Sequence, residues 1–265
     1  MQQTSTPRAV NYPTRVRNEL VFREITVKQV TTVAGCFRRV VFQGDQLAGF
    51  TSAGFDDHIK MFFPDPATGE LRLPTVTAEG IDWGDGPRPP NRDYTPLQFD
   101  AVRNELTIDF FIHAQGVASD WAATAKPGDR LAMGGPRGSL VVPESYAHQI
   151  YVCDESGLPA LRRRLAMVAA HGGKPSLTVL AFVSQPEAKT YLDDAPDVQC
   201  EWLVAAEGAT ADTLAERVRA LTLPAEDYFI WLTGEGEIVK GLSDHVLAQG
   251  TDPALVRAVA YWHAK

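Results

Sequence analysis

Cysteines are scarce: Cys36, Cys153 and Cys200 are the three in 265 residues, and no two of them form a C-x-x-C pair. Three widely spaced thiols can build neither a disulfide framework nor an iron–sulfur cluster held by four cysteines. We therefore interpret them as small buried hydrophobic residues of a protein kept in a reducing compartment.

Long apolar runs are also missing. No stretch is long enough to cross a bilayer as a helix, and residues 1–11 are polar and lack the apolar core of a secretory signal. These absences predict a cytoplasmic protein without a membrane partner. The net charge of −8 makes nucleic acid an unfavourable partner as well.

The acidic excess is uneven along the chain. Residues 146–265 carry 10 basic and 16 acidic side chains (net −6), whereas residues 1–145 carry 15 and 17 (net −2). The nearly balanced first part leaves room for a local basic patch that faces an anionic ligand.

Signatures of hydrolytic or metal-dependent catalysis are absent. The six histidines show no paired or H-x-x-E-H-type spacing, so no metal site is predicted. The sequence has no G-x-S-x-G elbow or other nucleophile signature. Chemistry by a protein nucleophile or by a protein-bound metal is therefore not indicated, and no catalytic side chain is predicted.

Two patterns of secondary structure divide the chain. Short β-type runs separated by Gly, Pro and Asp favour a small antiparallel β-barrel; they lie at residues 24–32, 37–43, 59–63, 95–100 and 105–113. After Pro143, strands alternate with helices, which predicts βαβ units and a parallel sheet. The expected strands are 149–153, 176–183, 200–204 and 228–233, and the expected helices are 158–171, 211–221, 235–249 and 253–262. We predict two domains, residues 1–145 (with 1–14 as a flexible lead-in) and residues 146–265.

The segment Arg92-Asp93-Tyr94-Thr95 carries the clearest ligand-binding pattern. In an extended segment, Arg92 and Tyr94 lie on one face, and Asp93 and Thr95 lie on the other. An arginine can bind a diphosphate through two N–H groups, a phenol ring can lie along a flavin, and a threonine hydroxyl can donate to flavin N5. Taken singly, Arg92 also fits a surface ion pair, and Tyr94 fits an ordinary half-buried strand aromatic.

A second motif follows about twenty residues later. Gly116-Val117-Ala118-Ser119 precedes an expected helix at residues 120–125. Small residues let the backbone approach a ligand closely, and free N–H groups at a helix start favour an anionic phosphate. The two motifs in this order predict a flavin nucleotide site at the edge of the β-rich half.

These motifs resemble a known family. Arg92-Asp93-Tyr94-Thr95 is similar to the Arg-x-Tyr-Ser/Thr flavin motif of the ferredoxin reductase superfamily. Further segments resemble its siderophore-interacting branch, the FAD-dependent ferric-siderophore reductases. They are residues 58–64 (HIKMFFP), 109–113 (DFFIH), 135–138 (GPRG), 153–159 (CDESGLP) and 260–262 (AYW). The resemblance extends from about residue 16 to the end of the chain.

The resemblance implies a FAD site in the first domain. It gives His113 a role in seating the cofactor, although a structural role fits this histidine equally well. The expected FAD-binding residues are Arg92, Asp93, Tyr94, Thr95, Phe111, His113, Gly116, Ala118, Ser119 and Trp121.

A site for NADH or NADPH is expected in the second domain. The turn after its first strand, residues 154–157, has one glycine and two carboxylates and so departs from G-x-G-x-x-G. The siderophore-interacting branch carries an acidic version of this turn. The resemblance therefore implies an NAD(P)H site made of Asp154, Glu155, Ser156, Thr233, Gly234 and Glu235. The alternative is an α/β domain with altered nucleotide binding and a reduced ferredoxin as the electron donor.

The implied activity is the reduction of ferric siderophores. FAD would take a hydride from NADH or NADPH and pass single electrons to siderophore-bound Fe(III), releasing Fe(II) for iron assimilation. The candidates for binding the anionic chelate are Lys60, Arg137, Lys240 and Lys265. Lys60 equally fits a stem that lies along the barrel with a solvated head, and Lys240 and Lys265 also fit solvated surface positions. Two other functions remain open: a general flavin reductase or electron-transfer flavoprotein, including one fed by ferredoxin, and a non-redox siderophore-binding protein.

Overall fold

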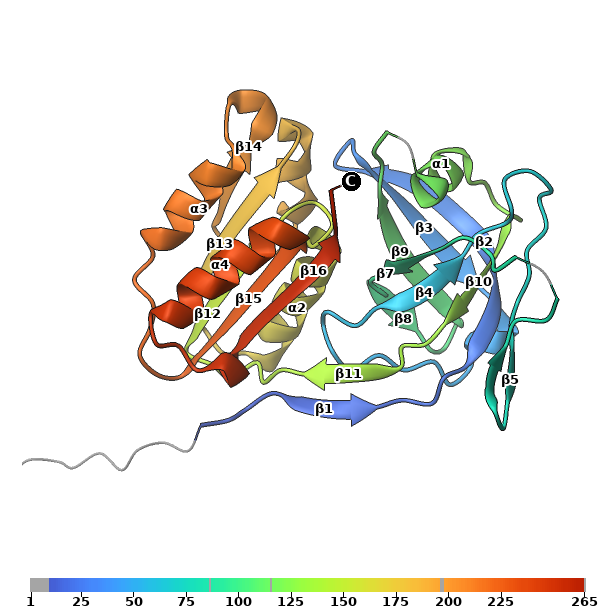
Figure 1. Ribbon diagram of the computed structural model, residues 1–265, viewed down its shortest axis with the longest axis horizontal. Coiled ribbons are helices and arrows are strands. Elements are labelled where there is room, and N and C mark those ends of the chain that lie inside the picture. The colour runs from blue at the N-terminus through green and yellow to red at the C-terminus, as the bar shows by residue number, and fades with distance from the viewer. Residues whose placement is uncertain (1–9, 86, 115, 196–197, 265) are drawn as a thin grey trace, which may run out of the picture.

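The computed structural model describes residues 10–264 apart from positions 86, 115, 196 and 197. A β-rich half and an α/β half lie side by side (Figure 1). This arrangement confirms the predicted fold class, an antiparallel β domain followed by a domain with a parallel sheet. No helix in the described part of the chain has the length and apolar character that a membrane span requires.

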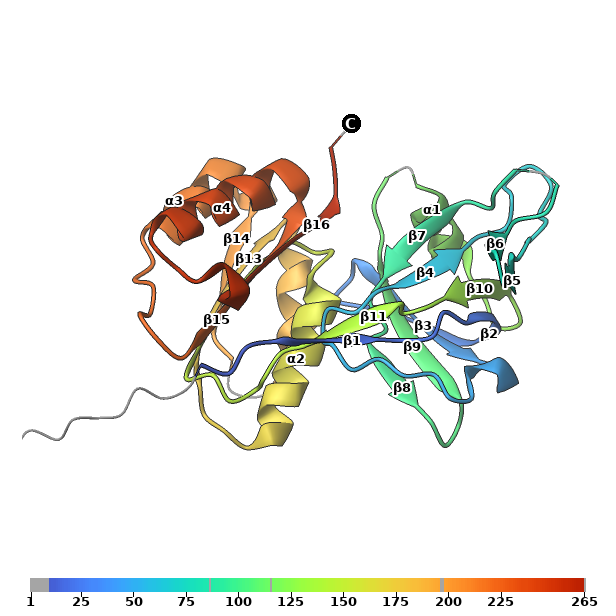
Figure 2. The same ribbon diagram turned by 60° about the horizontal axis from the view of Figure 1, so that its bottom comes forward.

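The β-rich half is built on a seven-stranded antiparallel sheet of order β7-β4-β10-β2-β3-β9-β8. The sheet curls around its own core (Figures 1 and 2). Its strands are β2 (Phe22–Val33), β3 (Phe37–Gln43), β4 (Ile59–Phe62), β7 (Asn91–Tyr94), β8 (Gln98–Asp100), β9 (Glu105–Phe111) and β10 (Arg130–Gly134). Two ribbons flank it: β1 (Thr14–Arg17) pairs with β11 (Gly138–Val141), and β5 (Thr75–Thr77) pairs with β6 (Gly80–Asp82). One short helix, α1 (Val117–Thr124), lies against β9 and β3.

The core of this half follows the period of two expected for strands. On β9, Leu106, Ile108 and Phe110 are buried at alternate positions. On β3, Val40 and Phe42 are fully buried. These side chains meet inside the curled sheet.

The α/β half has a five-stranded parallel sheet of order β14-β13-β12-β15-β16. Its strands are β12 (His148–Cys153), β13 (Ser176–Val183), β14 (Cys200–Val204), β15 (Tyr228–Glu235) and β16 (Val256–Trp262). The helix α2 (Leu158–His171) covers one face of the sheet, and α3 (Ala211–Arg219) and α4 (Gly236–Ala248) cover the other (Figures 1 and 2). Short 3-10 turns complete the chain: η1 (Asp45–Leu47), η2 (Pro186–Leu192), η3 (Ala205–Glu207) and η4 (Pro253–Leu255).

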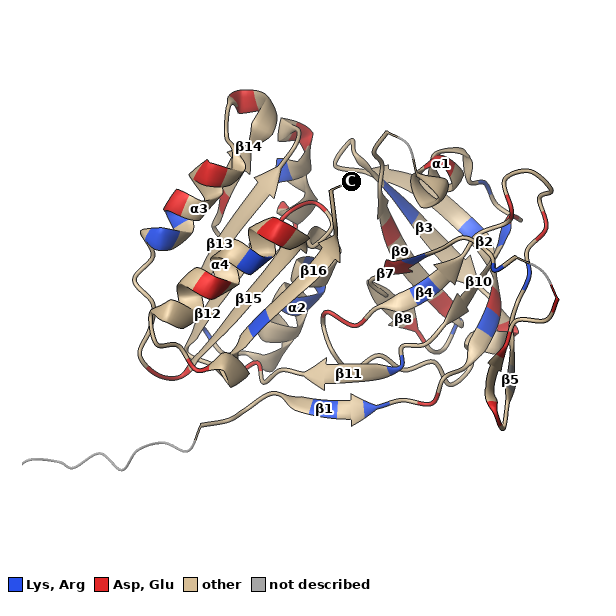
Figure 3. Ribbon diagram, viewed as in Figure 1, with Lys and Arg blue, Asp and Glu red and all other residues tan. Residues whose placement is uncertain are grey.

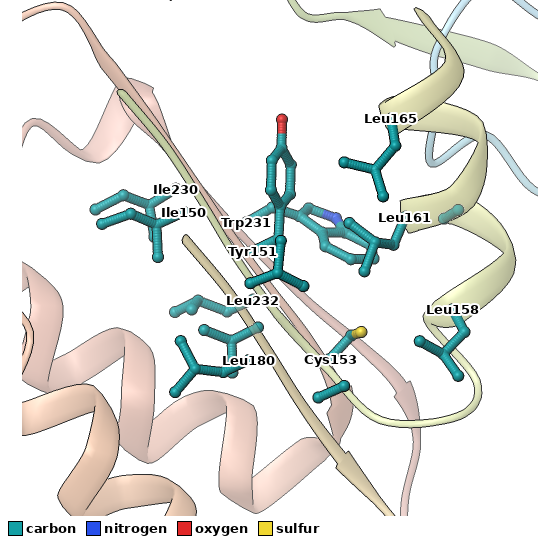
Figure 4. Close-up of a cluster of buried hydrophobic side chains, with 14 of the residues drawn as sticks. Ile150, Tyr151, Cys153, Leu158, Leu161, Leu165, Leu180, Ile230, Trp231 and Leu232 are labelled. Atoms are coloured by element: carbon teal, nitrogen blue, oxygen red, sulfur yellow. The ribbon is translucent and has the colours of Figure 1, made fainter. Parts of the chain in front are cut away.

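Figure 4 shows the core between this sheet and α2. Trp231 and Tyr151 project from the central strands toward Leu161 and Leu165 of the helix, and all four side chains are almost completely buried. The outer helices α3 and α4 carry charges of both signs (Figure 3). The apolar faces therefore turn inward on both sides of the sheet.

Several predicted elements need correction. The helix expected at residues 253–262 is the turn η4 followed by the strand β16. Val256 and Val259 favour a strand, and the crossover through α4 returns the chain beside β15, where pairing outweighs the helix propensity of the alanines. Of the strand expected at 95–100, only residues 98–100 form a strand, β8, and residues 95–97 connect it to β7. Between them lies Pro96, which has no N–H to donate. The expected lead-in, residues 1–14, includes Thr14, the first residue of β1.

The two halves are joined by a segment of the first half, residues 51–58. The ring of Phe55 packs against Tyr151, Phe229 and Trp231 at centroid distances of 6.3, 6.3 and 5.4 Å. The next residue, Asp56, accepts hydrogen bonds from Trp231 Nε1 at 3.3 Å and from Arg257 Nε at 2.9 Å. We use the term seam for this contact of residues 51–58 with β12, β15 and β16, and we include Thr95 and Tyr261, which lie beside it.

A second polar contact crosses between the halves. Arg39 donates two hydrogen bonds to the Asp109 carboxylate, at 2.8 and 2.7 Å, and the Tyr191 hydroxyl of η2 donates to the same carboxylate. Burial raises the pKa of the Tyr191 phenol, and the neighbouring Asp109 carboxylate raises it further, so the hydroxyl stays protonated as a donor. Both halves are thus held by buried polar contacts as well as by apolar packing.

Candidate functional site

The predicted site residues lie on elements that face each other across the boundary of the two halves (Figure 1). The first half contributes β7 and the start of α1. The second half contributes the carboxyl ends of β12 and β15, where open parallel sheets bind ligands. In the described residues, no group of three or more His, Cys, Asp or Glu side chains could hold a metal ion.

Arg92 and Tyr94 share one face of β7, as predicted. The Arg92 side chain is exposed, its Nη1 donates to the carbonyl of Asn91 at 2.7 Å, and no carboxylate of a described residue pairs with it. The Tyr94 ring packs 4.4 Å from the Phe110 ring. Burial raises the Tyr94 pKa, while the Arg92 charge lowers it by a smaller amount, so the two side chains are neighbours. The guanidinium is free to bind an anion.

Asp93 and Thr95 lie on the other face. Asp93 accepts from Lys60 Nζ at 2.7 Å, and β4 and β7 pair in register at these two residues. Thr95 is buried and lies beside Tyr261 of β16. Asp93 therefore neutralises a predicted substrate lysine, and Thr95 points into the seam.

The start of α1 offers free backbone donors. The helix begins at Val117, three residues earlier than predicted; its N-cap Gly116 supplies no capping side chain, and the Asp120 carboxylate of the first turn accepts from the Gly116 N–H at 3.4 Å. The Ser119 hydroxyl accepts from the backbone N–H of His113 at 2.9 Å and donates to its carbonyl at 2.7 Å. A Cβ at Gly116 would lie 3.0 Å from Cε1 of His113, so a glycine lets the imidazole lie against the helix start. Ser119 thereby positions an uncapped N-terminus of the kind that favours phosphate.

The remaining predicted aromatic residues are packed in different ways. Trp121 stacks on Phe42 at 6.2 Å and 14°, and its ring also contacts Phe63 and Phe110 inside the first half. Phe111 lies 6.1 Å from the imidazole of His113, and that histidine is exposed. His113 is thus accessible to a ligand, whereas the Trp121 ring takes part in the core.

These features fit a flavin dinucleotide. Arg92 supplies an unpaired guanidinium, and α1 supplies uncapped N–H groups, both suited to a diphosphate. Across the seam, the buried hydroxyl of Tyr261 has no hydrogen-bond partner among the described residues. Tyr261 lies in β16, within the range where the sequence predicted a helix, and it was not among the predicted site residues, although its segment, residues 260–262, contributed to the family resemblance.

The two predicted nucleotide turns are brought together. The expected turn at residues 233–236 is the end of β15 and the start of α4, and a Cβ at Gly234 would lie 2.8 Å from Asp154 Oδ2, so the end of β15 touches the turn after β12. Asp154 Oδ1 accepts from the backbone N–H and the hydroxyl of Ser156. Burial raises the Asp154 pKa despite these donors. Glu155 accepts from the backbone N–H of Ser184, and Thr233 donates to the carbonyl of Val259 at 2.7 Å.

The C-terminal segment, residues 262–264, lies over these turns. Trp262 Nε1 donates to Asp154 Oδ2 at 2.7 Å, and the backbone N–H of Ala264 donates to Glu235 Oε1 at 3.2 Å. Glu235 also caps α4, and its backbone donors lower its pKa. The imidazole of His263 is packed on Gly236, where a Cβ would lie 2.2 Å from its Cε1. Asp154 and Glu235 therefore already hold hydrogen bonds from the chain's own C-terminal segment.

The predicted substrate residues are not all neighbours. Lys60 lies opposite Gly134 of β10 in the register of the sheet, and Gly134 precedes the exposed Arg137 by three residues. Lys240 is on the exposed face of α4 and pairs with Asp244 at 2.9 Å. The fourth candidate, Lys265, lies outside the described residues.

Two hollows in the structure lie away from these residues. One of about 300 Å³ is lined by His148 and Ser176, the first residues of β12 and β13, and so lies at the amino edge of the parallel sheet. Another of about 230 Å³ lies between Phe50, Pro96 and Arg163. Ligands of open parallel sheets bind at the carboxyl edge, so we assign neither hollow to the nucleotide.

Two family models match the chain. Residues 26–140 match a siderophore-interacting FAD-binding domain, and residues 146–265 match the siderophore-interacting protein model. The chain belongs to the siderophore-interacting protein family. Membership confirms the resemblance noted in the sequence and agrees with FAD as the cofactor.

Relatives of this family are similar over most of their length. The chain is 54% identical over 261 residues to an NADPH-dependent ferric-chelate reductase of Escherichia coli, covering 98% of this chain and 99% of the relative. It is 31% identical over 204 residues to the ferric vibriobactin reductase of Vibrio cholerae, covering 76% and 74%. The crystal structure of a siderophore utilization protein from T. fusca superposes with a TM-score of 0.86 at 32% identity, covering 95% and 96%.

Proposed function

We propose that this protein uses NADPH and FAD to reduce Fe(III) bound to siderophores. One observation carries the proposal: an unpaired arginine and an uncapped helix start on the β-rich half face the carboxyl edge of a parallel sheet. The 54% identity to a ferric-chelate reductase that uses NADPH supports the same substrates for this chain. A FAD domain at residues 1–145, an NADPH domain at 146–265 and a cytoplasmic location are parts of the proposal.

Each half has a separate task in this reaction. Arg92 and the start of α1 would hold the FAD diphosphate, with Ser119 fixing the position of the helix start. Bound FAD supplies the redox chemistry, accepting a hydride from NADPH and delivering electrons singly to the ferric chelate. Lys60 and Arg137 would attract the anionic chelate. Hard oxygen donors hold Fe(II) more weakly than Fe(III), so the reduced iron dissociates.

An anaerobic titration of the purified protein tests this function. We expect NADPH to bleach the flavin absorbance and a ferric siderophore to restore it, with Fe(II) trapped by a ferrous chelator. A protein that binds ferric siderophore but no flavin would be a non-redox binding protein. Flavin that NADPH reduces but ferric siderophore does not reoxidise would indicate a general flavin reductase. If reduced ferredoxin bleaches the flavin and NADPH does not, ferredoxin is the electron donor.

Trp262→Phe should lower the KM for NADPH by about 2- to 10-fold, the range given by one hydrogen bond. The indole N–H of Trp262 holds the C-terminal segment on Asp154. This segment must leave Asp154 and Glu235 before a dinucleotide can contact them. Phenylalanine keeps the aromatic ring but removes the donor, so the segment opens more easily. Steady-state kinetics with NADPH varied at saturating ferric chelate measures the change.

Trp202→Phe is the matched control because Trp202 is a partly buried indole on β14, at the opposite edge of the sheet from β16. Its KM for NADPH should stay at the wild-type value. If Trp262→Phe instead raises the KM, the indole belongs to the nucleotide site and does not act as a cover.

Lys60→Gln should raise the KM for an anionic ferric siderophore about 1.5- to 5-fold. The Lys60 side chain is 45% exposed and paired with Asp93, and an exposed charge of this kind contributes about 0.2–1 kcal/mol. The increase should shrink at high ionic strength and for an uncharged chelate, because salt screens an exposed charge. Reduction of the flavin by NADPH should not change.

Lys28→Gln provides the control for Lys60. Lys28 is 43% exposed and also pairs with one carboxylate, that of Glu105. Phe22 of β2 and Lys60 of β4 both lie opposite Gly134 of β10, one on each side. Lys28 is six residues further along β2 than Phe22, so it lies about 20 Å along the sheet from the position of Lys60. If both substitutions raise the KM for the anionic ferric siderophore equally, the KM depends on the net charge of the protein, and Lys60 does not belong to a local binding site. Lys240→Gln, measured at the same salt, shows whether the α4 lysine contributes.

A further inference from the structure

The hydroxyl of Tyr261 stands apart from the other buried phenols of this protein. It is fully buried and has no hydrogen-bond partner among the described residues. By contrast, the Tyr151 hydroxyl donates to Gln149 and accepts from Arg164 at 2.8 Å, and the Tyr191 hydroxyl donates to Asp109. Buried polar groups without a partner destabilise a folded protein, so each one calls for an explanation.

The surroundings of Tyr261 keep its phenol protonated. Burial raises its pKa, the Asp56 carboxylate raises it further, and Thr95 and Arg257 lower it by smaller amounts. The ring packs at 80° against Trp231, with centroids 6.3 Å apart. The group is therefore a neutral O–H donor, held in place by its ring and lacking an acceptor.

One candidate acceptor is Thr95, which belongs to the other half of the protein. The two side chains are close enough for a polar contact with Thr95 to lower the Tyr261 pKa, although the Tyr261 hydroxyl has no partner at full hydrogen-bond geometry among the described residues. Thr95 directly follows Tyr94 in the motif that begins at Arg92, and it is buried at 7% exposure.

We infer that Tyr261 is a positioning residue for the flavin, acting through Thr95. A hydroxyl can accept one hydrogen bond while it donates another. When Thr95 donates to a bound flavin ring, its oxygen can accept the O–H of Tyr261, and each bond strengthens the other. The inference rests on the proposed FAD site and adds that the α/β half takes part in holding the flavin through β16.

A double-mutant cycle tests the inference, with FAD affinity measured by fluorescence quenching on reconstituted apoprotein. Tyr261→Phe alone should raise the Kd for FAD about 2- to 10-fold, the value of one hydrogen bond. In a Thr95→Val background, Tyr261→Phe should leave the Kd unchanged, because the hydroxyl through which it acts is gone. The absorption spectrum of bound flavin should differ between Tyr261→Phe and the wild type. It should be the same in the double variant as in Thr95→Val alone.

The stability of the apoprotein gives an independent readout. Tyr261→Phe removes a buried unpaired hydroxyl, so the apoprotein should be at least as stable as the wild type in urea. The control Tyr151→Phe removes a satisfied hydroxyl; it should lower stability and leave the Kd for FAD unchanged.

Two results would overturn the inference: a Kd for FAD within twofold of the wild type in Tyr261→Phe, or equal effects of Tyr261→Phe in both backgrounds. Loss of apoprotein stability in Tyr261→Phe would also count against it, since the hydroxyl would then be structural. Failure of the wild-type protein to bind FAD would instead refute the proposed function, so the two failures are distinguishable.

Discussion

Replacing Asp56 with alanine should lower the free energy of unfolding by about 3 kcal/mol. The Asp56 side chain is 1% exposed and pairs with Arg257, whose side chain is 25% exposed. Its removal leaves the guanidinium of Arg257 without its counterion and the indole N–H of Trp231 without its acceptor. Breaking one side of a buried ion pair costs far more than losing an exposed one, because the remaining charge stays poorly solvated.

Urea unfolding of the apoprotein, compared with wild type, measures this effect. Asp244→Ala serves as the control, since Asp244 pairs with Lys240 on the exposed face of α4, and its loss should change stability little. If Asp56→Ala unfolds at the wild-type urea concentration, the hydrogen bonds of Asp56 to Trp231 and Arg257 contribute no net stability, and the Phe55 packing and the Asp109–Tyr191 contact join the halves without them.

The sequence predicted the regular elements well because their signals are local. The strands at residues 37–43, 176–183 and 200–204 and the helix at 158–171 have the bounds that the structure gives them, since each combines a clear period with flanking Gly, Pro or polar residues. The strand β16 was missed for a physical reason. Its alanines favour a helix, and only the pairing with β15, set by the path of the chain through α4, makes it a strand.

The candidate site residues fall into two groups, those within short motifs and those that meet only through the fold. Arg92, Tyr94 and the start of α1 belong to short motifs; the structure puts Arg92 and Tyr94 on the expected strand and starts the helix three residues before the expected position. The contacts that couple the halves join residues far apart in sequence: Asp56 with Arg257, Thr95 with Tyr261, and Asp154 with Trp262. No local pattern records such pairs, because they depend on how two separately patterned halves pack.

Arg92→Ala should weaken FAD binding about 10- to 150-fold. A charge-assisted contact to a diphosphate contributes about 1.5–3 kcal/mol, and each 1.4 kcal/mol is a tenfold change in Kd. In the structure, the guanidinium donates to the carbonyl of its neighbour Asn91 and pairs with no carboxylate of a described residue. Truncating the side chain should therefore leave the stability of the apoprotein close to wild type, so the loss appears in cofactor binding alone.

Fluorescence titration of apoprotein with FAD, repeated with FMN, locates the contact. FMN lacks the diphosphate, so its affinity should fall less than that of FAD in Arg92→Ala. Arg103→Ala is the control, because Arg103 is 68% exposed and pairs with Asp100 in the β8–β9 turn; neither flavin should be affected. An unchanged Kd for FAD in Arg92→Ala would refute the role of this arginine. The uncapped start of α1, which offers backbone N–H donors that no side-chain substitution removes, would then have to hold the diphosphate without it.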